Sequence, residues 1–185
     1  QVLLIVTDVF GNSGSCSSNV TVEDDIPPVA ACQNVTIQLD ENGSVSISPE
    51  DVWTNPPTDA SGIASSTVSP SSFTCAEVGP NTVTLTVVDN NKNVTTCTST
   101  VIVEDNIKPV FDSCPTDVAQ TADGGVCGAT VALAIPTFSD NCSATVAWVM
   151  SGDVTDSGNG VLSNYTFPVG TTTITYTLTD VNSNI

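Results

Sequence analysis

The sequence predicts an all-β fold in which tandem antiparallel β-sandwich modules form an extended rod. Apolar residues alternate with threonine and serine in stretches such as Val35–Leu39, Thr82–Val87 and Thr173–Leu178. That alternation is typical of strands with one buried and one solvated face. Turn-forming stretches such as Glu41–Gly43 and Val78–Asn81 separate the strands. No longer stretch has the period of a helix.

Two short signatures recur along the chain and predict the modules. A strand ending in Asp-x-x-x-Asn occurs at Leu4–Asn12, Leu85–Asn93 and Tyr176–Asn184. An acidic, proline-containing stretch follows the first two copies, at Val22–Val29 and Val103–Val110. The interval of about 80–90 residues, with seven or so short strands in each, favours an immunoglobulin-like sandwich. Small modules in tandem usually supply length and spacing rather than a single active site.

The signatures divide the chain into three parts. We expect residues 1–25 to be the last strands of a truncated module and residues 26–106 to be a complete module. Residues 107–185 should form a module that lacks its last strand. The sequence is therefore expected to be part of a longer array.

Charge excludes several classes of partner. Two basic residues stand against 20 acidic ones, so the net charge at pH 7 is −18. Such an excess repels nucleic acid and anionic membranes. The apolar run Val2–Val6 is too short to span a bilayer, so no membrane insertion is expected. The chain has no histidine and nothing that resembles a phosphate-binding loop, and we expect no enzymatic activity from it.

Seven cysteines without histidine indicate disulfides and an oxidising compartment rather than zinc. Cys32 follows the first junction, and Cys97 begins the last strand of the central module. First and last strands should run in the same direction, so both cysteines should lie at the same end and form a disulfide. The alternative, Cys97–Cys114, would need a sharp fold-back, because the intervening residues span roughly 56 Å when extended.

The other cysteines lead to less direct predictions. We expect Cys127 and Cys142 to pair within the C-terminal module, and Cys16 and Cys114 to have partners outside the sequence. Cys75 remains, because Ser61 stands where a partner would be natural. It would be either a buried free thiol or an intermolecular link.

The junctions are also candidate calcium sites, because calcium takes six to eight oxygen ligands from carboxylates, amides and carbonyls. Acidic residues that leave one module should face the Asp and Asn residues at the start of the next. At the first junction the candidates are Glu23, Asp24, Asp25, Asp59, Asp89, Asn91 and Asn93. At the second they are Glu104, Asp105, Asn106, Asp140, Asn141, Asp180, Asn182 and Asn184. The alternative is that these residues only form turns, for which Asp and Asn are well suited.

Several motifs together resemble the hyalin repeat, or HYR, family across essentially the whole chain. Besides the two signatures, they are Cys114-Pro115, the Ser-Asp-Asn-Cys stretch 139–142 and the Pro-Val-Gly-Thr stretch within 167–176. The segment Ser69–Val78 resembles a variant found in very long secreted proteins of Bacteroidetes-type bacteria, although Ser61 departs from that variant's usual cysteine. The resemblance implies an immunoglobulin-like extracellular module of surface adhesins, and it identifies no ligand.

The sequence supports one function above two alternatives. We expect a structural and adhesive repeat segment of a long secreted or cell-surface protein, stapled by disulfides and stiffened by calcium. Its partners would be neighbouring repeats of the same chain, with surface glycans or other cell-surface proteins as further candidates. One alternative is a module that itself binds glycan or protein. The other is an accessory domain of a secreted enzyme.

Overall fold

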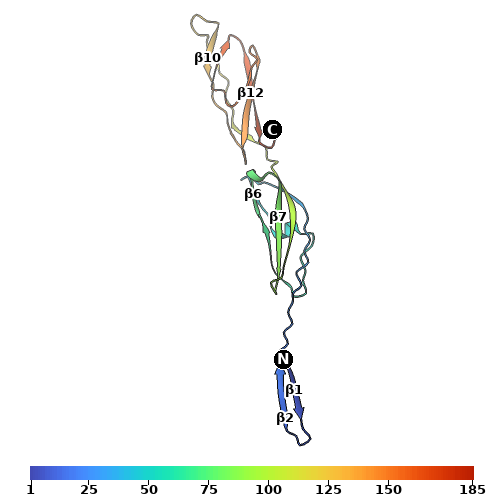
Figure 1. The fold of residues 1–185 in the computed structure, drawn as a ribbon. Helices are drawn as coiled ribbons and strands as arrows, with labels where there is room; N and C mark the ends of the chain where they lie inside the picture. Colours follow the sequence, from blue (N-terminus) through green and yellow to red (C-terminus); the bar gives the residue numbers. More distant parts are fainter.

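The computed structural model describes residues 1–185 as three parts placed end to end (Figure 1). A hairpin near the N-terminus is followed by an extended link, a central module and a C-terminal module. We call the part that contains β3 to β8 the central module and the part that contains β9 to β15 the C-terminal module. The molecule is a narrow rod, as the sequence predicts.

The N-terminal hairpin consists of β1 (Val2–Thr7) and β2 (Ser13–Ser18). The strands are antiparallel, with Val2 opposite Ser18 and Thr7 opposite Ser13. Every residue of both strands is exposed, including the five apolar residues of β1. The hairpin therefore has strand geometry but no core of its own.

The central module contains six strands and two short helices. A four-stranded sheet has the order β3-β8-β7-β5, and β4 pairs with β6 in a second, smaller sheet. The short helix α1 begins at Pro49, directly after its N-cap residue Ser48, and both residue types are common at these positions. The elements are β3 (Val35–Gln38), β4 (Ser44–Ser46), α1 (Pro49–Val52), β5 (Ile63–Ser69), β6 (Ser72–Thr74), η1 (Cys75–Glu77), β7 (Gly79–Asp89) and β8 (Val94–Glu104).

One strand pair departs from the predicted antiparallel arrangement. β8 is antiparallel to β7 but parallel to β3. The first and last strands of the module both run from one end of the rod toward the other, so they can only pair in parallel. We call the end with the Asp89–Asn93 turn the entry end and the end where β8 finishes the exit end.

The core of the central module lies between its two sheets. Val83, Leu85 and Val87 alternate along β7 and are completely buried. Val101 from β8 and Phe73 from β6 complete the contact between the layers. The threonines between the buried residues of β7 point away from the core. The alternation of side chains along the strand therefore decides which face of the sheet is buried.

The first and last strands are joined by the predicted Cys32–Cys97 disulfide. Its Cα atoms are 5.9 Å apart, within the usual range for a disulfide. The backbone of Cys32 also forms an isolated antiparallel β-bridge with Trp53, and both residues pack against the core. This disulfide therefore joins the beginning of the module to its last strand near the entry end.

The C-terminal module has seven strands in three small sheets. β13, β12 and β15 form one sheet in that order, β10 pairs with β14, and β9 pairs with β11. Trp148 and Met150 of β12 and Leu178 of β15 are buried between the layers. The bounds are β9 (Val110–Ser113), β10 (Gly128–Ala132), β11 (Thr137–Ser139), β12 (Ala144–Gly152), β13 (Ser157–Asn159), β14 (Asn164–Pro168) and β15 (Thr172–Asp180).

Only α1 and η1 are helical, and neither has the length or apolar character of a membrane span.

Replacing Leu85 by alanine should destabilise the central module strongly. Leu85 is fully buried, and truncation of such a side chain costs about 2–5 kcal/mol of unfolding free energy. Urea unfolding followed by Trp53 fluorescence, in a Trp148→Phe background, measures the change. Ile102→Ala is the matched control, because Ile102 lies on β8 but is 40% exposed. Equal losses in the two variants would contradict the assigned core.

The hydrogen bonds that cap η1 should make the stability of the central module depend on pH, with a loss of stability at low pH. The Glu77 carboxylate accepts hydrogen bonds from the Thr74 hydroxyl (2.7 Å) and backbone nitrogen (2.8 Å). These bonds hold the pKa of Glu77 below its ordinary value of 4.5. The stabilisation is therefore present above that value and is lost as pH falls through the lower, folded-state pKa. Glu77→Gln should lose less stability than the wild type when urea midpoints are compared between pH 7 and pH 2. Glu41→Gln, on an exposed turn, should follow the wild type.

Candidate metal sites at the module junctions

The same aspartate turn is built at the entry end of each part of the chain. In the central module, one carboxylate oxygen of Asp89 accepts hydrogen bonds from the backbone nitrogens of Asn91 (2.8 Å) and Asn93 (2.7 Å). The other oxygen accepts one from the Asn93 side chain at 2.8 Å. Asp180 makes the equivalent bonds with Asn182 and Asn184. This explains why aspartate and asparagine recur four residues apart.

The turn also forms where no module precedes it in the structure. Asp8 accepts the same bonds from Asn12, although the whole hairpin is exposed. These bonds, first of all the one from the Asn12 side chain, lower the pKa of Asp8. Turn formation is thus a property of the local sequence, and it holds the aspartate in its charged form.

Burial distinguishes the turn at Asp89 from the one at Asp8. Asp89 is only 1% exposed. Burial raises the pKa of this carboxyl, but the hydrogen bonds from Asn93 and Asn91 outweigh it, and the net pKa lies below the ordinary value. The carboxylate is therefore charged at neutral pH although it has little access to water.

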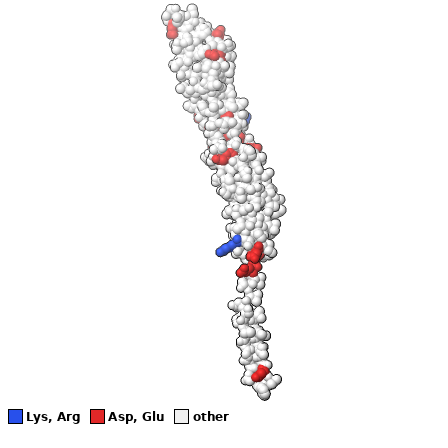
Figure 2. Space-filling view, viewed as in Figure 1, with Lys and Arg blue, Asp and Glu red and all other residues white.

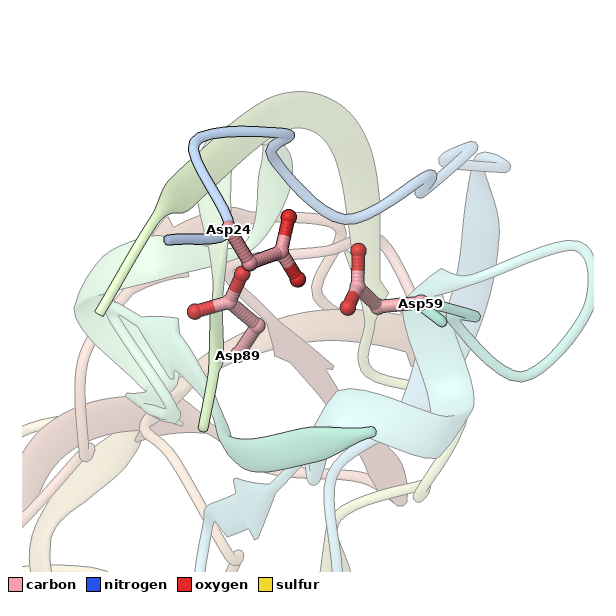
Figure 3. A group of neighbouring side chains, drawn as sticks. All are labelled: Asp24, Asp59 and Asp89. Atoms are coloured by element: carbon pink, nitrogen blue, oxygen red, sulfur yellow. The ribbon is translucent and has the colours of Figure 1, made fainter. Parts of the chain in front are cut away.

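At the first junction, Asp89 is joined by two other carboxylates (Figure 3). Asp24 comes from the link that leaves the hairpin, and Asp59 comes from the loop before β5. One carboxylate oxygen from each of the three lies within 4.8 Å of the others. The Asn93 side chain donates to the backbone oxygen of Asp24 at 2.8 Å, which ties the link to the turn.

The second junction repeats this arrangement. Asp105 leaves the central module, and Asp140 and Asp180 come from the C-terminal module. One carboxylate oxygen from each again lies within 4.8 Å of the others. Asp105 and Asp180 are 4% and 6% exposed.

Asparagine side chains hold Asp105 in place from the far side of the second junction. Asn141 and Asn182 each donate to a different carboxylate oxygen of Asp105 at 3.0 Å. Asn184 donates to the Asp105 backbone oxygen at 2.9 Å. One oxygen of the Asp140 carboxylate and the side-chain oxygen of Asn141 are buried without a hydrogen-bond partner. The second junction thus has oxygen atoms that no protein donor satisfies.

Five of the residues predicted as calcium ligands lie outside these clusters. Glu23 and Asp25 are exposed on either side of Asp24, because successive side chains of an extended backbone point to opposite sides. The same holds at the second junction, where Glu104 and Asn106 both contact Gln38 instead. The Asn91 side chain is exposed, and only its backbone takes part in the turn.

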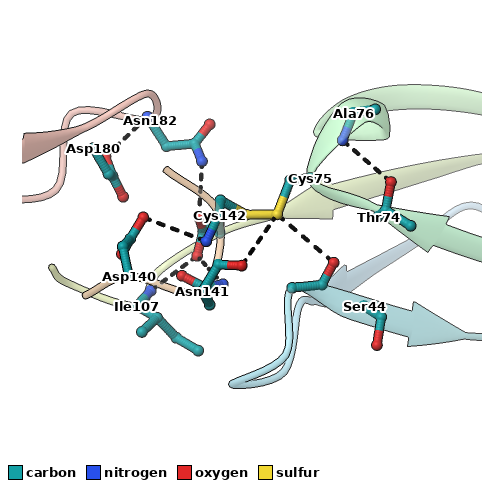
Figure 4. Close-up of a disulfide and its surroundings, with 12 residues drawn as sticks. Ser44, Thr74, Cys75, Ala76, Ile107, Asp140, Asn141, Cys142, Asp180 and Asn182 are labelled. Atoms are coloured by element: carbon teal, nitrogen blue, oxygen red, sulfur yellow. Dashed lines mark hydrogen bonds between the residues drawn. A yellow bond between two sulfur atoms is a disulfide. The ribbon is translucent and has the colours of Figure 1, made fainter. Parts of the chain in front are cut away.

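The second junction is also crosslinked, which corrects two predictions. Cys75 forms a disulfide with Cys142 (Figure 4), with Cα atoms 5.5 Å apart. Cys75 is therefore not a free thiol, and Cys142 does not pair with Cys127. Cys142 is linked to Cys75 of the preceding module, whereas Cys127 directly precedes β10. β10 lies toward the end of the C-terminal module that is far from the junction (Figure 1). Cys16, Cys114 and Cys127 are unpaired and exposed.

Local structure places Cys75 at the exit end of the central module. It begins η1, directly after β6, and its sulfur lies 3.6 Å from the backbone oxygen of Asn141. Gly43, in the turn before β4, leaves room for the crosslink. A Cβ atom there would lie only 2.7 Å from the Cys75 sulfur. The disulfide is therefore packed between two modules.

A signal for this pairing was present in the sequence. Cys142 follows Asp140 by two residues, just as Ser61 follows Asp59. Because this loop faces the preceding module, a cysteine in it has a partner there and not in its own module.

The junctions stand out in the charge distribution. Figure 2 shows acidic side chains gathered at both junctions, with further ones at the far end of the C-terminal module and near the tip of the hairpin, and largely uncharged flanks between these places. The three side chains of each cluster are all carboxylates. Convergent oxygen atoms of this kind are what a hard divalent cation such as calcium prefers.

Comparison with known proteins gives a family match for the C-terminal module. Residues 104–185 match the HYR domain family. The chain is 33% identical to Hyalin from Strongylocentrotus purpuratus and 32% identical to Hyalin from Lytechinus variegatus, each over 99% of its length. It spans 15% and 34% of those two proteins. Both are sea urchin proteins, and they give no support to the expected bacterial parent.

Solved structures are only distantly similar. Fibronectin(III)-like modules of Clostridium thermocellum CbhA share 13% identity over 85% of this chain and 87% of that one, with a TM-score of 0.31. The IG1+IG2 structure of DIP-gamma shares 12% identity over 82% of this chain and 96% of that one, with a TM-score of 0.24. The fold described above therefore rests on the strand pairing and core of this chain.

Removing the crosslink should loosen the second junction without unfolding either module. In Cys75→Ser/Cys142→Ser, the two modules should reorient more independently, which small-angle scattering would show as a broader distribution of interatomic distances. Cys32→Ser/Cys97→Ser is the contrasting variant, because it should lower the stability of the central module by about 2–5 kcal/mol. A loss of similar size in the first variant, with unchanged scattering, would contradict the proposed role of this disulfide.

Proposed function

Because residues 104–185 match the HYR domain family, we propose that the whole chain is a stretch of tandem HYR-type modules. Its function would be to form a stiff spacer in a secreted or cell-surface adhesive protein. The similarity to both hyalins over 99% of the chain supports the extension to the central module. The two disulfides are typical of an oxidising, extracellular setting.

The observation that carries this proposal is the construction of the second junction. A disulfide, three asparagine side chains and a buried aspartate all cross from one module to the other. Inter-domain contacts normally leave domains free to move unless they are extensive. A junction held by covalent and buried polar contacts fixes the direction of the next module. Repetition of such junctions would give a rod of defined length.

Calcium at the junctions is part of the same proposal. A buried carboxylate is costly unless it is paired or coordinates a metal. Each junction brings three carboxylates together, and two of the three at the second junction are almost completely buried. Asp24, Asp59 and Asp89 would hold one ion, and Asp105, Asp140 and Asp180 the other. The ion would neutralise the clustered charge and join residues from both sides of each junction.

The unpartnered oxygens favour a cation over turn formation alone. The turn bonds of Asp180 are complete without Asp140. Turn chemistry therefore gives no reason for the buried Asp140 and Asn141 oxygens that lack partners. A cation bound between these two oxygens would explain why they are buried without hydrogen-bond partners.

No observation favours the two alternative functions to the same degree. Glycan platforms normally present clustered aromatic rings, whereas Phe10 is the aromatic residue among the highly exposed large side chains. Acid–base catalysis would need the junction carboxylates in an open cleft, and two of the three at the second junction are buried. We therefore propose a non-enzymatic spacer whose direct partners are neighbouring modules.

Calcium should raise the melting temperature of the chain. An ion that binds only the folded state adds about 2.7 kcal/mol at a concentration one hundred times its dissociation constant. Differential scanning calorimetry in chelator and in millimolar calcium measures the shift, and isothermal titration measures the number of sites. Asp59→Asn and Asp140→Asn should each remove one site, at the first and second junction respectively.

The matched control is Asp117→Asn, because Asp117 is exposed and lies away from both junctions. It should retain both sites. Identical melting of the wild type in chelator and in calcium would contradict the metal sites. That result would not decide whether the chain is a stiff spacer, which the small-angle scattering of the disulfide variants tests separately.

A further inference from the structure

The disulfide between the two modules lies next to a carboxylate of the second junction. Asp140 comes two residues before Cys142, and the Cys142 backbone nitrogen donates a hydrogen bond of 3.4 Å to the Asp140 side chain. Figure 4 shows the disulfide together with Asp140, Asn141 and Asp180. The crosslink and the carboxylates of this junction are therefore parts of one local structure.

The loop that carries Asp140 rests against a turn of the central module. The Cys75 sulfur lies 3.6 Å from the backbone oxygen of Asn141 and 3.7 Å from that of Gly43. The Asn141 side chain donates to the backbone oxygen of Asp40 at 3.3 Å. Any Cβ atom at Gly43 would collide with the Asn141 backbone oxygen. The disulfide thus holds the loop in close contact with the module before it.

The oxygen atoms of this loop have unused capacity to bind a cation. One oxygen of Asp140 is buried without a hydrogen-bond partner, and so is the side-chain oxygen of Asn141. The other Asp140 oxygen accepts the bond from Cys142, which is longer than the usual range of about 2.7–3.2 Å. Asp105 and Asp180, whose carboxylates converge on Asp140, are 4% and 6% exposed. The position of the loop therefore decides whether a complete set of oxygen ligands is present.

The corresponding loop at the first junction is held in a different way. Ser61 follows Asp59 by two residues, as Cys142 follows Asp140. The backbone nitrogen and the hydroxyl of Ser61 both donate to the same Asp59 oxygen, at 2.8 Å and 2.7 Å. Because a carboxylate oxygen has two lone pairs, these two bonds occupy that oxygen. This loop is thus held by bonds within itself, whereas the loop at the second junction is held by a bond to the preceding module.

We propose, on the premise that the calcium sites of the proposed function exist, that the Cys75–Cys142 disulfide sets the affinity of the second site. With the bond intact, Asp140 is held beside the other two carboxylates before the ion arrives. Binding then requires little further ordering of the loop, and such preorganisation raises affinity. Without the bond, the ion must order the loop as it binds. The two cysteines are therefore positioning residues that act on the ion through Asp140.

This coupling acts in both directions, as the linkage of two equilibria requires. If the disulfide raises calcium affinity by a given factor, bound calcium must favour the oxidised form by the same factor. With dithiothreitol as the reductant, the disulfide takes up two electrons and two protons and becomes two thiols. Dithiothreitol loses them and closes into a cyclic disulfide. A crosslink that only joined the modules would show no such dependence on calcium.

Isothermal titration of calcium into the 185-residue chain measures the first direction. The Asp59→Asn background isolates the second site. In it, Cys75→Ala/Cys142→Ala should bind calcium at least about fivefold more weakly, which is the lower end of typical coupling between sites. Alanine is used because a serine at position 142 could donate to Asp140 as Ser61 does to Asp59. In the matched control, the same double replacement in the Asp140→Asn background should leave the affinity of the first site unchanged.

Thiol trapping with peptide mapping measures the second direction. The three unpaired cysteines are replaced by serine in the Asp59→Asn background, so that they cannot exchange with the disulfides. Reduction of Cys75–Cys142 in dithiothreitol buffers is then counted in molecules whose Cys32–Cys97 bond is intact. Saturating calcium should raise the ratio of reduced to oxidised dithiothreitol needed for half-reduction by the factor found in the titrations. Adding Asp140→Asn should abolish this shift.

Failure of this inference differs from failure of the calcium sites. Equal calcium affinity with and without the disulfide overturns the inference and leaves the second site in place. A reduction equilibrium that calcium does not shift, although calcium binds, has the same meaning. Absence of calcium binding in the Asp59→Asn chain with its disulfide intact rejects the second site and this inference together.

Discussion

At each junction, an aspartate that ends a strand is held in a turn by amide donors, and other amides of the same module reach across to the part of the chain before it. Asn93 contacts both Asp89 and the Asp24 backbone, and Asn184 contacts both Asp180 and the Asp105 backbone. The geometry of the turn and the position of the neighbour are therefore fixed by one side chain. The direction of the rod, the approach of the acidic residues and the reach of the crosslink all depend on this arrangement.

The sandwich itself is simpler than the junctions that join it. Alternating valines and threonines produce two sheets, and the disulfide near the entry end joins first strand to last. In the C-terminal module, the segment between β9 and β10 that corresponds to β3 forms no strand.

Features that belong to one module could be predicted from the sequence, and features shared by two modules could be predicted only in part. Cys32–Cys97 follows from the direction of two strands in the same sandwich. Cys75–Cys142 required knowing that the loop with Cys142 faces backward across the junction. The paired aspartate clusters were predicted because both signatures repeat. Glu104 lies outside its cluster and contacts Gln38 instead, because composition does not show to which side of an extended backbone a side chain points.

Ser61 makes the two junctions unequal, and this difference concerns how the rod would respond to a pulling force. The second junction has a covalent bond across it, whereas the first is crossed by hydrogen bonds. Under tension, the first junction would extend before the second. A single cysteine-to-serine exchange in the loop would thus set where a long array yields. Rods with compliant and rigid joints in a chosen order could be encoded without altering any module core.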